Sequence, residues 1–138
     1  MKPYKIGYTT GVFDMFHIGH LNILEKAKEQ CEILIVGVST DEVVREYKNK
    51  VPIIPYNQRA RIVSALKCVD KVVPQENMNK FDAWKVIGFN VLFHGDDWKG
   101  SKMYDEIEKQ FAEVGVDLIF LKHTSGISST ILREKING

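Results

Sequence analysis

The sequence predicts an α/β domain built on a parallel sheet of five strands, with helices on both faces. Three observations lead to this expectation: short apolar runs recur along the chain, a segment of helical pattern separates each run from the next, and no repeat, linker or low-complexity tract intervenes. Such alternation is typical of a parallel sheet. The 138 residues are enough for one core, and we expect a single domain over 1–138.

We expect the carboxyl ends of the five strands to lie together at one edge of the sheet. They are expected at 5–10, 33–39, 71–73, 90–94 and 117–121. In parallel sheets with right-handed crossovers, ligands bind where these ends meet. The loops expected to line one cleft are therefore 9–20, 39–50, 74–80, 95–100 and 123–130.

Two histidines follow the first strand. The segment GVFDMFHIGH covers 11–20, and a helical pattern covers 18–30, so His17 and His20 lie where a strand gives way to a helix. The unpaired N–H groups and the dipole of a helix start favour phosphate, and Gly19 leaves room for its close approach. Both rings can then donate to oxygens of one phosphorus centre as a bond to pyrophosphate breaks.

The spacing of the two histidines alone also fits ordinary, partly buried side chains. Zinc binding is disfavoured because no paired cysteines or carboxylate-rich helix accompany them, and Cys31 and Cys68 stand apart. Two isolated cysteines are typical of reduced, apolar residues.

A second strand-to-helix junction lies at 123–133, with the sequence HTSGISSTILR. Gly126 permits a turn, Ser128 is a candidate N-cap, and Ser129 and Thr130 add hydroxyl donors beside exposed N–H groups. This segment can hold terminal phosphates. Simple helix capping would explain only one of the hydroxyl residues.

Cationic side chains gather in the loop expected at 45–55. Lys48 and Lys50 lie two apart and can close over anionic substrates, although a solvated charged loop is the common alternative. Arg59 and Arg61 follow in a helical segment and face different sides, so at most one reaches the cleft.

An acidic turn follows the fourth strand, where Asp96 and Asp97 precede Trp98. One carboxylate can order water around a Mg²⁺ ion carried by a triphosphate. Capping of the helix expected at 101–111 is an equally good explanation.

Composition excludes several classes of protein. The chain is 44% hydrophobic and 27% charged, with a net charge of +1, so no overall basic field points to nucleic acid. No apolar stretch approaches the length of a membrane span, and the first residues show no apolar signal segment. We therefore expect a cytoplasmic location.

Together these segments resemble the glycerol-3-phosphate cytidylyltransferases, within the wider HxGH cytidylyltransferase family. The resemblance covers nearly the whole chain. It rests on GVFDMFHIGH, STDE at 39–42, the Lys48 and Lys50 loop, YNQR at 56–59, VDKV at 69–72, GDDW at 95–98 and TSGISST at 124–130. The closing GISST is the part that narrows the resemblance from nucleotidyl transfer in general to cytidylyl transfer.

The resemblance implies a Rossmann-like fold of the nucleotidyltransferase type, and transfer of CMP from CTP, with Mg²⁺, to a phosphorylated alcohol. For glycerol-3-phosphate the products are CDP-glycerol, a donor for cell-envelope or capsule polymers, and pyrophosphate. It implies no covalent intermediate and a homodimer. His17 and His20 would stabilise the transition state, Lys48 and Lys50 would bridge the reacting phosphates, and Lys48, Arg59 and Lys80 would bind the acceptor. Residues implied at the nucleotide are Thr10, Gly11, Val12, Phe13, Gly19, Asp97, His123, Thr124, Gly126, Ile127, Ser128, Ser129 and Thr130.

Three departures from the family pattern concern the acceptor. His123 stands where an arginine normally opens the second motif, Lys67 replaces an arginine, and Met78 replaces a tryptophan. An acceptor such as phosphoethanolamine, phosphocholine, another polyol phosphate or a phosphorylated amino compound therefore stays open. A non-catalytic nucleotide-binding module is a further alternative, disfavoured by the intact His17 and His20.

Overall fold

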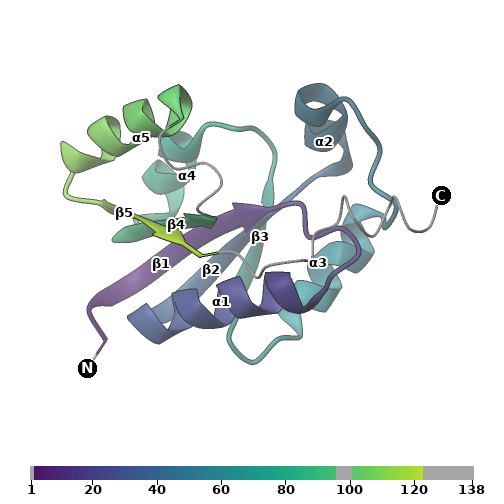
Figure 1. Ribbon diagram of the computed structural model, residues 1–138, viewed down its shortest axis with the longest axis horizontal. Coiled ribbons are helices and arrows are strands. Elements are labelled where there is room, and N and C mark those ends of the chain that lie inside the picture. The colour runs from purple at the N-terminus through teal and green to yellow at the C-terminus, as the bar shows by residue number, and fades with distance from the viewer. Residues whose placement is uncertain (1, 96–100, 123–138) are drawn as a thin grey trace.

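A computed structural model describes residues 2–95 and 101–122 of the chain. Its centre is a five-stranded sheet in the order β3-β2-β1-β4-β5, in which every neighbouring pair is parallel (Figure 1). The strands are β1 (Tyr4–Gly11), β2 (Cys31–Ser39), β3 (Lys71–Gln75), β4 (Val91–Gly95) and β5 (Asp117–Leu121). The strand order reverses between β1 and β4, so the carboxyl ends of these two strands mark the expected ligand position.

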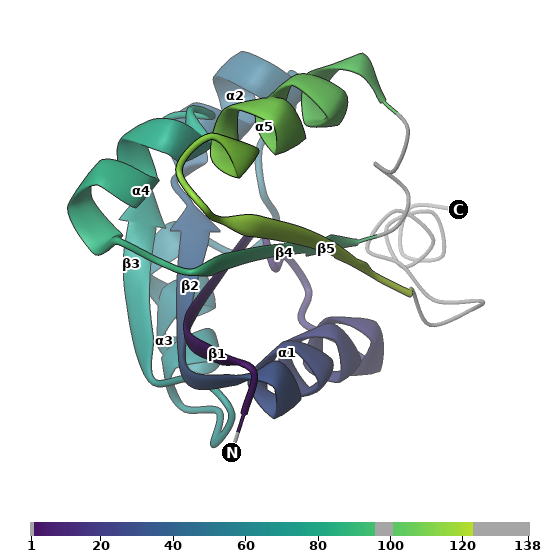
Figure 2. The ribbon, with the colours of Figure 1, turned by 90° about the vertical axis from the view of Figure 1, so that its left-hand side faces the viewer.

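Helices cover both faces of the sheet, as Figure 2 shows: α1 and α3 lie on one side, and α4 and α5 lie on the other. The helices are α1 (Ile18–Gln30), α2 (Asp41–Lys48), α3 (Tyr56–Ser64), α4 (Lys80–Ile87) and α5 (Lys102–Ala112). The predicted fold is confirmed. The extent of the domain over 1–138 stays a prediction.

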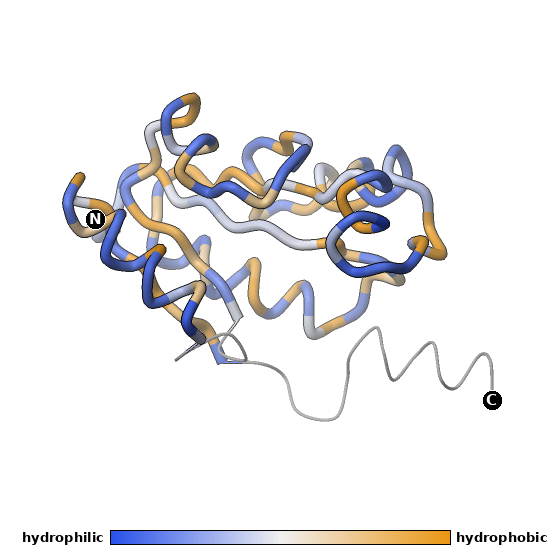
Figure 3. Tube along the Cα trace, turned by 90° about the horizontal axis from the view of Figure 1, so that it is seen from above, coloured by the Kyte–Doolittle hydropathy of each residue, from blue (hydrophilic) through white to orange (hydrophobic). Residues whose placement is uncertain are grey.

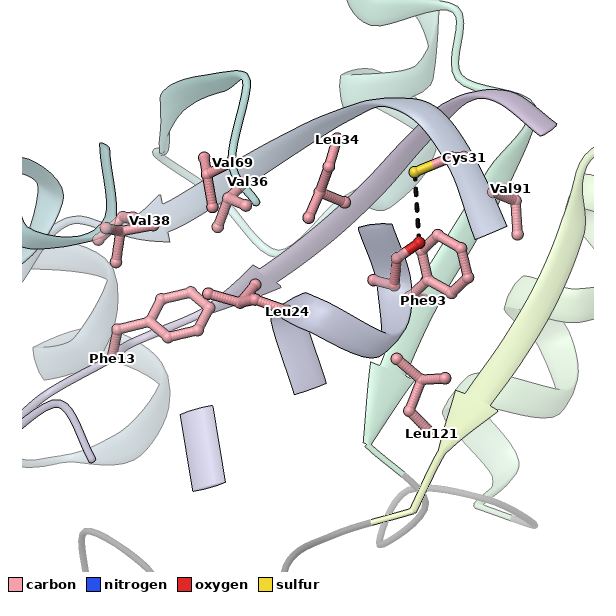
Figure 4. Close-up of a cluster of buried hydrophobic side chains, with 12 residues drawn as sticks. Phe13, Leu24, Cys31, Leu34, Val36, Val38, Val69, Val91, Phe93 and Leu121 are labelled. Atoms are coloured by element: carbon pink, nitrogen blue, oxygen red, sulfur yellow. Dashed lines mark hydrogen bonds between the residues drawn. The ribbon is translucent and has the colours of Figure 1, made fainter. Parts of the chain in front are cut away.

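Each face of the sheet buries its own apolar cluster. Under α1 and α3, Leu24 packs with Leu34 and Val36 of β2 and with Phe93 of β4 (Figure 4). In the same cluster the thiol of Cys31 lies 3.4 Å from the carbonyl oxygen of Ala27. Under α4 and α5 the members are Tyr8, Phe89, Leu92, Phe111 and Val116. The helices alternate apolar and polar residues along the chain because one side of each meets the sheet (Figure 3).

Successive residues of a strand point to opposite faces, and this alternation places the polar residues at the strand ends. Tyr8 and Leu92 belong to the cluster under α4 and α5. Two residues further along these strands, Thr10 and His94 therefore point to that same face. The polar ends of the strands thus lie beside α4 and α5, next to the carboxyl edge.

The predicted strands differ from the observed ones by at most two residues at either end. The third strand extends to Gln75 through Pro74, which β3 tolerates because it is an edge strand and Pro lacks only the N–H that a neighbour would use. The loop expected at 45–55 begins later, since α2 continues to Lys48 and ends at Asn49, whose φ is 53°. The run of charged residues concealed this helix, whose buried side consists of Val43 and Val44.

Candidate active site

The connection from β1 to α1 has an unusual backbone. Phe13 and Met15 adopt φ values of 54° and 49°, in the left-handed region that residues other than glycine rarely enter. Such conformations persist where surrounding contacts hold them, and they cluster at functional sites. The ring of Phe13 is buried in the core, which fixes the turn from below.

Asp14 holds this turn against the segment that precedes α3. Its side chain is 2% exposed, and its two carboxylate oxygens accept the backbone N–H groups of Ile53 and Ile54, each at 2.9 Å. Hydrogen bonds to a carboxylate are stronger than those between neutral groups. Asp14 lies inside the GVFDMFHIGH segment but is not among the predicted site residues.

Arg59 ties the same turn to the end of β2. Its guanidinium is 1% exposed and donates to the carbonyl oxygens of Val12 and Ser39, at 2.7 and 2.8 Å. It also donates to the carbonyl of Ile54 at 2.8 Å and to the carboxylate of Asp41 at 2.6 Å. Four of the five N–H donors of an arginine are therefore used within the chain.

This geometry does not support the predicted role of Arg59 in binding the acceptor phosphate, because three of its hydrogen bonds go to backbone carbonyls and a fourth goes to the carboxylate of Asp41. Arg59 instead positions the loops after β1 and β2. Its neighbour Arg61 is exposed, as expected for a residue on another side of the helix. The contacts of Arg59 join residues up to 47 apart, so no local pattern predicts them.

The two predicted catalytic histidines form a reciprocal cap at the start of α1. His17 is the N-cap residue, and its Nδ1 accepts the backbone N–H of Gly19 at 3.0 Å. His20, three residues on, returns the contact: its Nδ1 accepts the backbone N–H of His17 at 3.2 Å. In a capping box a serine or threonine and a glutamate usually make these contacts. Here two imidazoles satisfy the same orphan donors.

The cap also fixes the tautomer of both rings. Because each Nδ1 accepts a hydrogen bond, the single proton of the neutral imidazole must reside on Nε2. Burial lowers the pKa of His17 below its ordinary value, which favours this neutral form. The Nε2 atom of His17 is buried and has no hydrogen-bond partner among the described residues. Its N–H can therefore donate a hydrogen bond to a ligand.

A cavity of about 380 Å³ opens at the carboxyl ends of the strands, on the side of α4 and α5. We call it the strand-end cavity. The strand β1 and the turn after it, the helices α2 and α5, and the connection between β3 and α4 enclose it. Its lining residues are Thr10, Gly11, Val12, Ser39, Val43, Val44, Tyr47, Lys48, Gln75, Met78, Lys80, His94, Met103 and Tyr104.

Lys80, the first residue of α4, is the most deeply buried cation of this cavity. Its side chain is 4% exposed, and its ammonium donates to the hydroxyl of Thr10 at 2.7 Å. Burial, with a smaller contribution from the charge of Lys48, lowers the pKa of Lys80 to about 7. No carboxylate in the described part of the chain forms an ion pair with this ammonium. Burying an ammonium without such a partner is costly, so an anionic ligand would be favoured here.

The two lysines that the sequence predicts as a pair are both exposed. Lys48 ends α2 and lines the strand-end cavity, whereas Lys50 is not among its described lining residues. Thr10, Gly11 and Val12, predicted to contact the nucleotide, line the same cavity as Lys48. Their role at the nucleotide stays a prediction. Phe13 and Gly19 lie with the histidine cap.

The remaining predicted residues lie outside the described part of the chain: Asp97, His123, Thr124, Gly126, Ile127, Ser128, Ser129 and Thr130. Their roles stay predictions.

Within the described ranges 2–95 and 101–122, no group of three or more His, Cys, Asp or Glu side chains could hold a metal ion.

A comparison with family models matches residues 8–135 to the model described as cytidylyltransferase-like. The chain belongs to the cytidylyltransferase-like family. The match includes the turn after β1, the histidine cap and every described residue of the strand-end cavity.

Curated relatives fall into two groups of similar identity. The glycerol-3-phosphate cytidylyltransferase of Bacillus subtilis is 35% identical, and the alignment covers 94% of this chain and 95% of that protein. The corresponding Staphylococcus aureus protein is 33% identical over 94% of this chain and 93% of its own length. The bifunctional protein HldE of Helicobacter hepaticus is 37% identical over 99% of this chain, which spans only 28% of that longer protein.

Among solved structures, a lipopolysaccharide core biosynthesis protein from Thermoplasma volcanium superposes with a TM-score of 0.74 at 25% identity. The superposition covers 88% of this chain and 97% of that one. In the described part of this chain, no helix is both long and apolar enough to span a membrane.

Proposed function

We propose that this protein transfers CMP from CTP to glycerol-3-phosphate, giving CDP-glycerol and pyrophosphate. The nearly full-length similarity to two glycerol-3-phosphate cytidylyltransferases supports this substrate pair. The observation that carries the proposal is the placement of Lys48 and Lys80 on one cavity, beside the turn that leads to His17 and His20.

In this proposal the acceptor phosphate binds at Lys80 and Lys48. The ammonium of Lys80 is already oriented by Thr10. A phosphate dianion replaces the missing counter-charge, and its binding raises the protonated fraction of Lys80. Arg59 and Asp14 do not touch the acceptor; they position the turn that separates acceptor from nucleotide.

Transfer then proceeds by direct displacement. An oxygen of the acceptor phosphate attacks the α-phosphorus of CTP, a new P–O bond forms, and the bond from the α-phosphorus to the β-phosphate bridging oxygen breaks. The Nε2–H groups of His17 and His20 donate to the oxygens on which charge accumulates. Neutral rings suffice for this role, and the cap at α1 keeps them in the required tautomer.

Mg²⁺, carried by CTP, would neutralise charge on the triphosphate. The predicted nucleotide residues, Asp97 and those of the 123–130 segment, would hold that end of the substrate. The homodimer and the cytoplasmic location implied by the family resemblance stay predictions.

Pyrophosphate release is the direct test. Each of CTP, ATP, UTP and GTP is supplied with Mg²⁺ against glycerol-3-phosphate, phosphoethanolamine, phosphocholine and other polyol phosphates. We expect the highest kcat/KM for CTP with glycerol-3-phosphate. Binding of CTP without turnover for any acceptor would contradict the proposed enzyme and indicate a nucleotide-binding module.

A second candidate is transfer of CMP from CTP to a different phosphorylated small molecule, because the chain is not more similar to the glycerol-3-phosphate enzymes than to a relative of another name. The identity to the Helicobacter hepaticus protein, 37%, exceeds the 35% and 33% found for the two glycerol-3-phosphate enzymes above. If the protein prefers another acceptor with CTP, the proposed cytidylyl transfer stands and glycerol-3-phosphate is not the substrate.

A further inference from the structure

A second cavity, of about 360 Å³, is lined mainly by the edge strand β3, by α4 and by the connection between them. We call it the α4 cavity. A cavity of this size admits a small organic molecule. It shares Gln75 and Lys80 with the strand-end cavity, so these two side chains form a common wall. Its lining residues are Tyr8, Val73, Pro74, Gln75, Glu76, Asn77, Asn79, Lys80, Asp82, Ala83, Val86 and Ile87.

Tyr8 of β1 brings a hydroxyl group to the α4 cavity from inside the protein. The residue is 1% exposed, and its ring stacks on Phe89 with centroids 4.9 Å apart. The hydroxyl lies over Gly37 of β2, where a Cβ atom would collide with it. Gly37 is in turn the register partner of Val73, which lines the cavity. The side chain therefore extends from β1 across β2 toward the α4 cavity.

The hydroxyl of Tyr8 makes no hydrogen bond with any residue in the described part of the chain. Burial raises the pKa of Tyr8 to about 12, so the group stays protonated at neutral pH and can donate. A phenylalanine would fill the same apolar cluster without placing an unpaired hydroxyl in the interior, which is unfavourable. The hydroxyl is thus a donor for a molecule in the cavity.

Apolar side chains and two carboxylates form much of the rest of the α4 cavity. Ala83 and Ile87 are partly buried against the cluster under α4 and α5. Val86 is 88% exposed, so the cavity opens to solvent beside it. Glu76 and Asp82 are exposed, and neither forms an ion pair with a described cation. Unpaired carboxylates beside an apolar wall favour a ligand with a cationic end and an apolar body.

Charge distinguishes the two cavities. The ammonium of Lys80 donates to Thr10, which lines the strand-end cavity and is not among the described lining residues of the α4 cavity. The strand-end cavity is lined by two lysines, and none of its described lining residues is Asp or Glu. An anionic ligand is therefore favoured in the strand-end cavity and a cationic one in the α4 cavity.

We propose that the α4 cavity is a second binding site, for a small amine that has an apolar body and a hydrogen-bond acceptor. The ammonium lies near Glu76 and Asp82, the body lies against α4, and the acceptor receives the hydrogen bond of the Tyr8 hydroxyl. The site goes beyond the proposed cytidylyl transfer, which makes no use of these three residues.

Titration of the isotope-labelled protein with tyramine, followed by NMR, tests this site. Tyramine has a protonated amine, an aromatic ring and a phenol oxygen that can accept. Phenethylamine lacks that oxygen, and tyrosol replaces the amine with a neutral hydroxyl. We expect tyramine to bind about three- to fivefold more tightly than either, the effect of one hydrogen bond or exposed ion pairs. Amide signals of Ala83 and Val86 should shift more than those of Val43 and Met103, which line only the strand-end cavity.

Variants assign the binding to individual groups. Tyr8→Phe keeps the ring and should weaken tyramine binding about fivefold while leaving phenethylamine unchanged, since only tyramine loses a hydrogen bond. Glu76→Gln combined with Asp82→Asn should weaken both amines about threefold and leave tyrosol unchanged. Glu29→Gln, an exposed position of α1 on the other face of the sheet, is the control. A purely structural effect of Tyr8→Phe would weaken all three probes equally and would overturn the assignment.

Absence of shifts at Ala83 and Val86 with millimolar tyramine, or equal or tighter binding of tyrosol, would also overturn the proposal. The titration contains neither CTP nor an acceptor, so its result is independent of pyrophosphate release. The α4 site can fail while cytidylyl transfer stands, and a protein without turnover can still bind tyramine.

Discussion

The imidazole rings of His17 and His20 stack with centroids 3.9 Å apart and planes inclined by 24°. Each ring accepts a backbone N–H of the first turn of α1 through Nδ1. The two Nδ1 atoms therefore cap the start of α1 and also keep the proton of each neutral ring on Nε2. The local stability of α1 and the tautomer that the proposed mechanism requires therefore depend on one arrangement.

Replacing His17 with asparagine separates these roles. Asparagine is among the best N-cap residues, so α1 should keep its first turn and Tm should change little. The Nε2–H donor is lost, and we expect kcat to fall by about 10²–10³, the effect of removing one transition-state donor. Steady-state pyrophosphate release and thermal unfolding of the same preparation measure both.

His17→Ala removes both functions and is the comparison variant. It should lose about 1 kcal/mol of stability through the missing cap, in addition to the same loss of kcat. If His17→Asn retains wild-type kcat, the ring does not stabilise the transition state.

Protonation of His17 should lower both stability and activity in acid. Burial lowers its pKa in the folded state below the ordinary 6.5, so between these two values only the unfolded chain binds the proton. The free energy of unfolding therefore rises with pH across this window and levels off above about 6.5. Protonated Nδ1 also cannot accept the N–H of Gly19, so kcat should fall below the lowered pKa.

Thermal unfolding from pH 5 to 8 checks the stability effect, with His17→Asn as the reference for all other titrating groups. The difference in Tm between wild type and variant should change with pH below 6.5 and stay constant above it. A constant difference throughout would show that His17 does not titrate differently in the folded state.

The strands and the histidine site could be predicted from the sequence because their signals are local. Apolar runs mark strands whose two faces are covered, and the predicted helix at 18–30 coincides with α1. By contrast, α2 has only a short apolar side within a charged run, and its start depends on Thr40, whose hydroxyl accepts the N–H of Val43. From the sequence alone, a threonine at this position is equally typical of a loop, so it did not predict the start of α2.

The other site contacts could not be predicted because they are tertiary contacts between residues far apart in the sequence. Lys80 and Thr10 are 70 residues apart, and only the fold brings ammonium and hydroxyl to 2.7 Å. The partners of Arg59 likewise come from separate loops. An arginine in a helical segment could be predicted to approach the cleft, but its saturation by carbonyl oxygens could not.

Arg59→Met should destabilise the protein by about 3 kcal/mol, because it leaves buried carbonyl oxygens and the carboxylate of Asp41 without their donor. We also expect a lower kcat through displacement of the turn that contains Val12. Urea unfolding measures the stability change. Arg61→Met, an exposed arginine on the same helix, is the matched control and should behave as wild type. Near-normal stability with a selectively raised acceptor KM would instead return Arg59 to substrate binding.

Lys80→Met should make the protein more stable and weaken its binding of the acceptor. The pKa of Lys80 is about 7 in the folded protein and 10.5 ordinarily, so between these values the unfolded chain binds the proton and the folded chain does not. Stability of the wild type therefore falls as pH decreases from about 10.5 to about 7, and the variant lacks this loss. Its Tm should exceed that of the wild type, with a larger excess at pH 7 than at pH 10.

The same substitution should raise the KM for the acceptor at least about tenfold at pH 7, since a hydrogen bond to a charged group contributes about 1.5–3 kcal/mol. The KM for CTP should change little. Lys85→Met, an exposed lysine of the same helix, is the control for both measurements. A higher Tm with an unchanged acceptor KM would mean that the buried ammonium destabilises the fold but does not bind the acceptor. A lower Tm at every pH would mean that its hydrogen bond to Thr10 outweighs the cost of burying the charge.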